Sequence, residues 1–225
     1  DYEVVRIRVD LTDNERKEYE NYYNIFRNYV ISKGISMRSP KDFKKIVMLS
    51  GRDKKAREAI LARNKAEKIA YNSVNKIEKI RELLSRDNRT IIFTRYNDMV
   101  YEISRRFLIP CITYRTPEDE RQEILQKFRE GVYPAIVSSQ VLDEGIDVPE
   151  ADVGIVVSGT GSSREFVQRL GRLLRPRDGK RAVLYELVTR GTKEVSTSYR
   201  RRKNAPKRFA GCLQEKGEDK AEVSQ

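Results

Sequence analysis

The chain contains no histidine, and this absence excludes several kinds of active site. Without an imidazole there can be no Ser-His or Cys-His nucleophilic pair and no metal site built on histidine. The two cysteines, Cys111 and Cys212, lie far apart, so the sequence indicates neither a disulfide framework nor a zinc site. Arginine, lysine and the carboxylates remain, and these side chains suit chemistry on phosphate groups.

Long apolar runs are also absent, and acidic residues are outnumbered. No run approaches the ~20 apolar residues needed to cross a bilayer, so we expect no membrane-spanning segment. Lys and Arg total 46 against 34 Asp and Glu, giving a net charge of +12 and a pI near 9.6. This balance indicates a polyanionic partner such as nucleic acid or nucleotide phosphate, although basic intracellular proteins are common. The chain starts at Asp1 without methionine or signal peptide, and we expect a fragment of a longer intracellular protein.

From Thr90 onward, short apolar strands alternate with amphipathic helices. The strands expected are 90–93, 110–114, 135–138, 153–157 and 181–187, and the helices are 97–107, 117–130 and 163–174. This rhythm predicts an α/β fold with a mostly parallel sheet and helices on both faces. Residues 3–11 alternate apolar and polar side chains, so segment 1–11 should add a strand with one wet face. The domain proper is expected over 87–192, with a basic, mobile tail over 193–225.

A basic helical extension is expected over 12–86. Thr12 and Glu15 have the spacing of a capping box, and a break is expected near Ser50. Between Lys33 and Lys68 there are twelve Lys or Arg and four Asp or Glu. Such an arm could lie along a phosphate backbone, or it could be a solvated helix surface. The candidate contacts are Lys44, Lys45, Lys54 and Lys55.

Residues 162–176, SSREFVQRLGRLLRP, predict a half-buried helix rich in arginine. Ser162 and Glu165 have the capping-box spacing at its start, and Pro176 ends it. Positions i, i+4 and i+7 share one helix face. The residues on that face are Gln168, Arg172 and Arg175, those facing a core are Leu170, Leu173 and Leu174, and Arg169 lies off the first face. A solvated arginine stripe would give the same pattern.

Three further segments fall where a parallel sheet presents its loops. They are Thr94-Arg95, Thr116-Pro117, in which Thr116 is expected to be the N-cap and Pro117 the first helical residue, and SSQVLDEGIDVP over 138–149. Ligands of such sheets bind beyond the carboxyl ends of the strands. Taken together and in this order, the segments favour one phosphate-handling edge.

These segments resemble the motifs of the second RecA-like domain of superfamily 2 helicases. TIIFTR is similar to motif IV, SSQVLDEGIDVP to motif V and QRLGRLLR to motif VI, and the match spans about 90–190. Within the superfamily, LDEGIDVPEADVGIVVSGTGSSREFVQRLGRLLRP resembles the XPB-type DNA repair helicases. The chain departs from the family at Tyr114 or Arg115, where glycine is frequent.

The resemblance implies roles for the named residues. Motif VI in this superfamily places arginines against ATP phosphates, so Arg172 and Arg175 would be arginine fingers and Gln168 would sense the γ-phosphate. The other ATP-binding residues implied are Gly145, Asp147 and Arg169. The nucleic-acid-binding residues implied at the strand ends are Thr94, Arg95, Thr116, Ser138 and Ser139. Segment 12–86 would correspond to the thumb-like insertion that grips DNA in this family.

The same resemblance implies cofactors and partners. The chain has no GxxxxGK[ST] loop and, lacking histidine, no DExH box. ATP and Mg²⁺ would therefore be bound mainly by an N-terminal helicase lobe, and this chain alone should neither bind ATP tightly nor hydrolyse it. The expected partners are DNA, as single strand or fork, that N-terminal lobe, and a repair nuclease or a transcription and repair complex, with no membrane. The location would be cytoplasmic in an archaeon or bacterium and nuclear in a eukaryote.

Two other functions are compatible with parts of the sequence. The chain could be a lobe of another superfamily 2 motor acting on RNA or DNA, or a non-catalytic RecA-like module that binds nucleic acid. The arginine pair Arg172 and Arg175 argues against the second, because a scaffold has no need of arginine fingers. A dinucleotide-binding enzyme is excluded by the lack of GxGxxG after a strand.

Overall fold

The computed structural model describes residues 2–37, 39–139, 150–158, 174, 182–197 and 213–215. The chain forms two compact units, which we call the sheet unit (Asp1–Asp10 with Val74–Gln225) and the helical unit (Leu11–Ser73). The helical unit is thus an insertion that follows the first strand. It is shorter than the extension expected over 12–86, because the helix after Ser73 belongs to the sheet unit.

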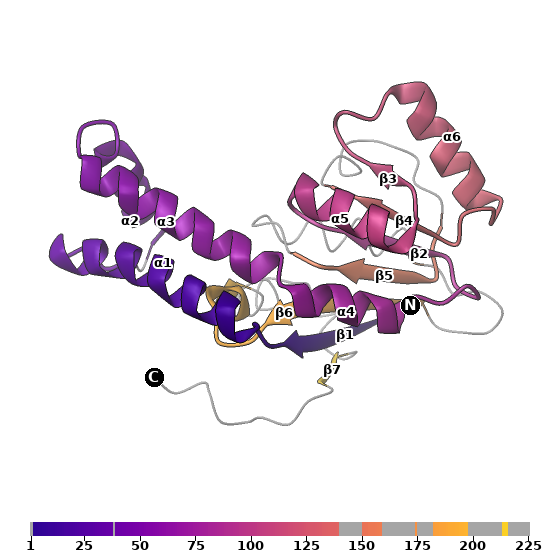
Figure 1. Ribbon diagram of the computed structural model, residues 1–225, viewed down its shortest axis with the longest axis horizontal. Helices are drawn as coiled ribbons and strands as arrows, with labels where there is room; N and C mark the ends of the chain where they lie inside the picture. The colour runs from indigo at the N-terminus through magenta and orange to yellow at the C-terminus, as the bar shows by residue number, and fades with distance from the viewer. Residues whose placement is uncertain are drawn as a thin grey trace. The chain divides into compact units, whose positions relative to one another are not determined.

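Seven strands of the described residues form one sheet in which every pairing is parallel (Figure 1). They are β1 (Tyr2–Val9), β2 (Thr90–Phe93), β3 (Cys111–Ile112), β4 (Ala135–Ser138), β5 (Val153–Val156), β6 (Ala182–Thr189) and β7 (Leu213–Glu215). Their order across the sheet is β3-β4-β2-β5-β6-β1-β7. The expected α/β fold with a parallel sheet is confirmed.

Two strands differ from expectation for identifiable reasons. The strand expected over 110–114 is only Cys111–Ile112, because Thr113 to Thr116 form a turn in which the Thr116 amide donates to the Thr113 carbonyl at 3.0 Å. Strand β6 continues to Thr189, because its register with β1 runs from Tyr2 opposite Ala182 to Val9 opposite Thr189.

Strand β1 is less exposed than the alternation of its sequence indicates. None of its residues is exposed, and Arg6 is only 5% accessible. The Arg6 guanidinium donates from Nη2 to Glu186 Oε2 at 3.1 Å, and the two residues lie opposite each other on β1 and β6. The polar side chain of Arg6 therefore pairs with a residue of the neighbouring strand and does not face solvent.

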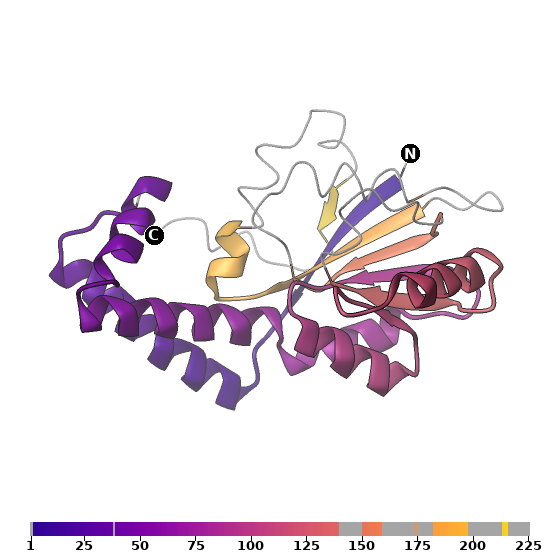
Figure 2. The same ribbon diagram turned by 90° about the horizontal axis from the view of Figure 1, so that it is seen from above.

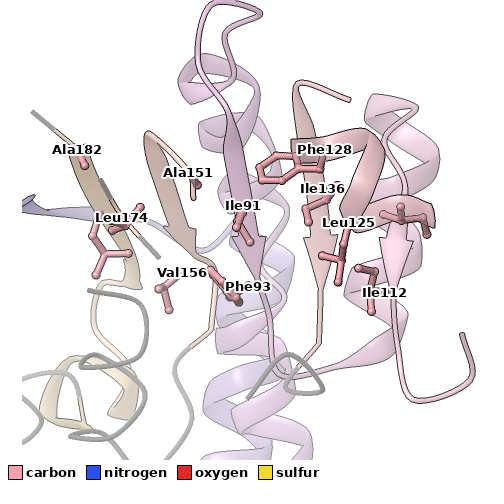
Figure 3. Packing of buried hydrophobic residues seen from close by; sticks show 12 residues of the cluster. Ile91, Phe93, Ile112, Leu125, Phe128, Ile136, Ala151, Val156, Leu174 and Ala182 are labelled. Atoms are coloured by element: carbon pink, nitrogen blue, oxygen red, sulfur yellow. The ribbon is translucent and has the colours of Figure 1, made fainter. Parts of the chain in front are cut away.

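Helices cover both faces of the sheet, as expected. Helices α4 (Val74–Leu83) and α5 (Asn97–Phe107) lie together on one face (Figure 2). Helix α6 (Glu118–Arg129) packs Leu125 and Phe128 on the other face, against Ile91 and Ile136 (Figure 3). Successive residues of a strand point to opposite faces, so Ile92 packs in the core beneath α4 and α5.

Leu174 is the one described residue of the arginine-rich segment, and it is buried as expected. It is 4% accessible and joins the core on the α6 side of the sheet (Figure 3). It forms an isolated parallel bridge with Ala151, so the helix expected over 163–174 does not include its last residue. The rest of that expected helix lies outside the described residues.

The first residues of the expected tail are folded. Residues 193–197 form a helical turn, and Glu194 is 2% accessible. The folded region therefore extends beyond 193. The remainder of the expected tail, apart from β7, lies outside the described residues.

The helical unit consists of α1 (Asp13–Ser32), α2 (Pro40–Leu49) and α3 (Lys54–Tyr71). The capping box at the start of α1 is confirmed: the Glu15 amide donates to Thr12 Oγ1 at 3.3 Å, and the Thr12 amide donates to Glu15 Oε2 at 2.9 Å. The break near Ser50 is confirmed, and a second, unexpected break separates α3 from α4. Along α3, small residues allow close packing against the aromatic side chains of α1. The buried alanines are Ala56, Ala59, Ala62, Ala66 and Ala70.

Among the described residues, no helix is long and apolar enough to span a membrane.

Gly154 in β5 leaves room for two core leucines, and filling that room should weaken the fold. A Cβ added at Gly154 would lie 2.9 Å from Leu184 Cδ1 and 3.4 Å from Leu174 Cδ2. We expect Gly154→Ala to lower the free energy of unfolding by about 1–3 kcal/mol through overpacking. Urea unfolding measures this change.

Gly51→Ala is the matched control, because its added Cβ would meet only the Met48 carbonyl, at 3.6 Å. Its effect should stay within about 0.5 kcal/mol. Equal effects of the two substitutions would contradict the packing explanation.

Candidate functional site

The candidate site lies at the carboxyl edge of the sheet. Because all paired strands run in parallel, the residues that follow them meet at one edge. Hydroxyl side chains occupy this edge after four strands: Thr94 after β2, Thr113 after β3, Ser138 and Ser139 at the end of β4, and Ser158 after β5. All five are buried.

Ser158 connects the ends of β5 and β2. Its Oγ accepts a hydrogen bond from the Arg95 amide at 2.6 Å and lies 3.0 Å from Thr94 Oγ1. The Thr94 amide in turn donates to the Ser138 carbonyl at 3.1 Å, which brings in β4. The motif IV residues and the first motif V residue are thereby brought together, as the sequence predicted.

Sequence reasoning missed Ser158. A signal was available, since Ser158 follows the buried strand 153–157 in the same way that Thr94 and Ser138 stand at strand ends.

The Ser138 hydroxyl is engaged within the protein. It is fully buried and lies within hydrogen-bond distance of two carbonyl acceptors, Ile112 at 3.2 Å and Ser139 at 2.8 Å. The Ser139 amide donates to the Ile112 carbonyl at 3.1 Å, so both serines hold β3 against β4. Their contact with nucleic acid stays a prediction.

The turn after β3 differs from its sequence-based description. Thr116 is not the N-cap of α6, because the cap position is Pro117 and the helix begins at Glu118. The Thr116 hydroxyl instead accepts from the Thr113 amide at 2.9 Å and closes the turn. At the tip of the turn, the exposed Arg115 donates from Nε to Tyr114 Oη at 2.9 Å. This hydrogen bond raises the pKa of Arg115.

Arg95 is an exposed cation at this edge. Its guanidinium lies 5.5 Å from the centre of the Tyr96 ring, while its amide is held by Ser158. An exposed guanidinium supported by an aromatic ring is suited to contact a phosphate or a base.

All the predicted residues of the ATP site fall outside the described residues. They are Gln168, Arg169, Arg172, Arg175, Gly145 and Asp147. In the part of the chain that is described, no group of three or more Cys, Asp or Glu side chains gathers as a metal site.

The helical unit presents its predicted lysines to solvent. Lys44 and Lys45 lie on α2, and Lys54 and Lys55 lie in the first turn of α3; all four are exposed. Lys45 lies 3.6 Å from Asp42, and Lys54 lies 4.0 Å from Glu58, distances at which exposed ion pairs are weak. The first turns of α1 are acidic in contrast, so positive charge is concentrated on α2 and the start of α3.

Asp53 organises the start of α3. It is the N-cap residue, and its Oδ1 accepts from the amides of Lys55 at 2.8 Å and Ala56 at 3.3 Å. Its Oδ2 accepts from Tyr29 Oη at 3.1 Å and lies 3.5 Å from Lys33 Nζ. Partial desolvation raises the pKa of the Asp53 carboxyl, but the hydrogen bonds from Tyr29, Ala56 and Lys55 outweigh it, so the pKa is lowered overall.

Comparison with known proteins identifies relatives of this chain. Residues 75–177 match the family described as the helicase conserved C-terminal domain. The chain is 47% identical over 203 residues to the DNA 3'-5' translocase XPB2 of Sulfurisphaera tokodaii, a match that covers 89% of this chain and 46% of the relative. It is 35% identical over 128 residues to the DNA 3'-5' helicase XPB of Mycobacterium tuberculosis, covering 55% of this chain and 23% of that protein.

The chain thus spans less than half the length of these relatives. Among solved structures, the C-terminal part of the Fun30 ATPase domain is similar, with a TM-score of 0.61, 13% identity and 88% coverage of both chains. At that identity the likeness shows the fold alone.

The lowered pKa of Asp53 makes the helical unit sensitive to acid. A carboxyl whose pKa is lower in the folded than in the unfolded state adds stability above its ordinary pKa of 3.8, and this stability is lost as the pH falls through the lowered value. Asp53→Asn keeps a capping oxygen but cannot titrate. We expect the stability advantage of wild type over Asp53→Asn to shrink as the pH falls below that ordinary value.

Thermal unfolding followed by far-ultraviolet circular dichroism, across a series of acidic buffers, measures this difference. A difference between the two proteins that stays constant through the series would contradict the assignment.

Proposed function

Because this chain belongs to the XPB-type superfamily 2 helicases and corresponds to their C-terminal half, we propose that it is the C-terminal motor lobe of an ATP-dependent DNA helicase or translocase. In this proposal the lobe supplies arginine fingers and DNA contacts to an ATPase site that it shares with an N-terminal lobe. The two-lobe protein is the active enzyme, and this lobe alone is inactive.

One observation carries the proposal. The segments that the sequence identifies as motif IV and the start of motif V are joined at one sheet edge, through Ser158, Thr94 and the Ser138 carbonyl. Motif VI comes after β5 and Ser158 in the chain and begins at Gln168. The order of the motifs and the meeting of their strand ends support a single working surface on this edge.

The ATP-facing role falls to the motif VI residues. ATP with Mg²⁺, when bound, supplies the phosphoryl group whose transfer to water drives the motor. Arg172 and Arg175 would hold guanidinium groups against the phosphate oxygens, and Gln168 would contact the γ-phosphate. A guanidinium suits this task because it forms bidentate hydrogen bonds with phosphate and stays protonated at all relevant pH values. Gly145, Asp147 and Arg169 would complete this lobe's side of the site.

The parts of the nucleotide site that this chain lacks are assigned to the N-terminal lobe. No GxxxxGK[ST] sequence is present, so the phosphate-binding loop and the main Mg²⁺ ligands would come from that lobe.

DNA would be held in two places. At the sheet edge, Arg95 offers an exposed guanidinium, and Thr94, Thr116, Ser138 and Ser139 would be the other residues that contact DNA. On the helical unit, Lys44, Lys45, Lys54 and Lys55 would contact phosphates as a thumb-like insertion. Single-stranded or forked DNA, the N-terminal lobe, and a repair nuclease or transcription and repair complex are the partners in this proposal, with an archaeal cytoplasm as its setting.

The arginine fingers give the decisive test. In a protein that joins this chain to its natural N-terminal half, we expect Arg172→Ala and Arg175→Ala each to lower DNA-stimulated ATP hydrolysis by roughly a hundredfold or more, because transition-state charge is left unneutralised. DNA binding should persist in both variants. Steady-state ATPase assays and DNA-binding titrations measure the two effects, and the chain without its N-terminal half should show no turnover.

Arg105→Ala is the matched control, since Arg105 is exposed on α5 and pairs with Glu102, one turn earlier in the same helix, at 3.1 Å. If the motif VI variants hydrolyse ATP at the wild-type rate, the arginines of that segment form only a solvated stripe, and the proposal is wrong.

If the lysines of the helical unit contact phosphates, they should contribute to the salt dependence of DNA binding. We expect Lys44→Ala with Lys45→Ala to weaken DNA binding and to reduce the slope of log Kd against log salt by about 0.7–0.9 for each phosphate that the variant no longer neutralises. Lys17→Ala in the acidic part of α1 is the control and should leave the slope unchanged. Fluorescence anisotropy over a salt series measures these slopes. If the lysines only form a solvated surface, the double variant and the wild type should have equal slopes.

A further inference from the structure

A lysine is fully buried in the sheet unit, outside the helicase motifs. Lys76, in the first turn of α4, is 0% accessible. Its Nζ donates to both carboxylate oxygens of Glu194, at 2.7 and 2.9 Å, and to the Val157 carbonyl at 2.6 Å. These three hydrogen bonds equal the number of donors that an ammonium carries.

Glu194, the partner of Lys76, is also buried and hydrogen-bonded. It is 2% accessible, its Oε2 accepts from the Thr189 amide at 2.9 Å, and its own amide donates to Thr192 Oγ1 at 3.3 Å. Burial raises the pKa of Glu194, and the ammonium of Lys76 opposes that rise. The pair therefore ties the start of α4 to the residues that follow β6.

The third bond of Lys76 reaches the working edge. Val157 is the residue before Ser158, and its amide donates to the Phe93 carbonyl at 2.8 Å. Lys76 thus hydrogen-bonds to the Val157–Ser158 peptide, and the Ser158 hydroxyl contacts the Thr94 hydroxyl and the Arg95 amide. The same peptide immediately precedes the segment 159–181, which contains Gln168, Arg172 and Arg175.

A contribution to stability does not by itself explain why Lys76 and Glu194 are buried here. Removing two charges from water is costly, and buried ion pairs are often replaced by apolar residues of similar size without loss of stability. What apolar residues cannot replace is the donor to the Val157 carbonyl. That donor distinguishes a positioning role from a packing role.

We propose that Lys76 is a positioning residue of the motor, which fixes the Val157–Ser158 peptide and thereby the point from which the arginine-bearing segment leaves the sheet. Glu194 holds the ammonium in the position from which it donates to that carbonyl. This inference rests on the proposed function of the chain, and it adds to it a residue outside the helicase motifs.

The test uses the full protein with its N-terminal half. In Lys76→Met alone, the unpaired buried Glu194 should lower the unfolding midpoint. In the double variant Lys76→Met/Glu194→Leu the midpoint should recover part of this loss, because the unpaired carboxylate is gone, but kcat for DNA-stimulated ATP hydrolysis should stay about 10-fold to 100-fold lower. The KM for ATP should change by less than about twofold, because no ATP contact is removed. A folded double variant with wild-type kcat would overturn the proposal.

Two more measurements keep the test decisive if the double variant folds poorly. Glu194→Gln keeps a neutral acceptor for Lys76 and hence its bond to Val157, so its kcat should lie within about threefold of wild type. A loss as large as that of the double variant would rule out the role assigned to the Val157 carbonyl. Lys79→Met, whose lysine pairs with Glu82 within α4, is the matched control and should behave as wild type.

Hydrogen exchange separates this inference from the proposed function. The Arg95 amide, which Ser158 holds, should exchange faster in Lys76→Met and in the double variant but not in Lys79→Met. An unchanged Arg95 amide would refute the positioning role. If the wild-type protein shows no DNA-stimulated ATPase activity, the proposed function fails, and exchange at Arg95 still decides whether Lys76 positions this edge.

Discussion

The parallel direction of every paired strand is the constraint on which the rest of the structure depends. Parallel strands place all their carboxyl ends on one side, so residues from distant parts of the chain meet there. Thr94 and Ser158 are 64 residues apart and share a hydrogen bond. An antiparallel neighbour would have sent one of these ends to the opposite edge. The site is therefore a consequence of strand direction before it is a consequence of side-chain chemistry.

Local features of this fold were readable from the sequence, whereas features set by distant partners were not. The capping box of Thr12 and Glu15 depends on residues three apart, and the strand at 90–93 depends on a run of apolar side chains, so both were predicted correctly. Arg6 was placed in water because its partner, Glu186, lies 180 residues away and no periodicity reports it. The turn at Thr113 shortened a strand because one hydroxyl closed it.

The same distinction between local and distant partners separates the correct from the missed predictions at the candidate site. Thr94 and Ser138 were placed at the edge correctly, because Thr94 follows a recognisable strand and Ser138 ends one. The roles of their hydroxyls could not be predicted, since Ser138 turns toward the carbonyls of Ile112 and Ser139, and Thr94 turns toward Ser158. Lys76 was hidden for a different reason. A lysine among polar and charged residues of a helix, such as Asn75 and Glu78, is predicted to be solvated until Glu194 is seen beside it.

The position of the helical unit after β1 has a consequence for how the chain folds. The contacts of α1 with α3 join residues close in sequence, and such contacts form early. Strand β1 is made before the other strands of this sheet, yet its partner β6 is complete only when residue 189 has been added. During synthesis β1 must wait, unpaired, beside an insertion that can already be native. The first strand of the sequence is therefore among the last to join the sheet.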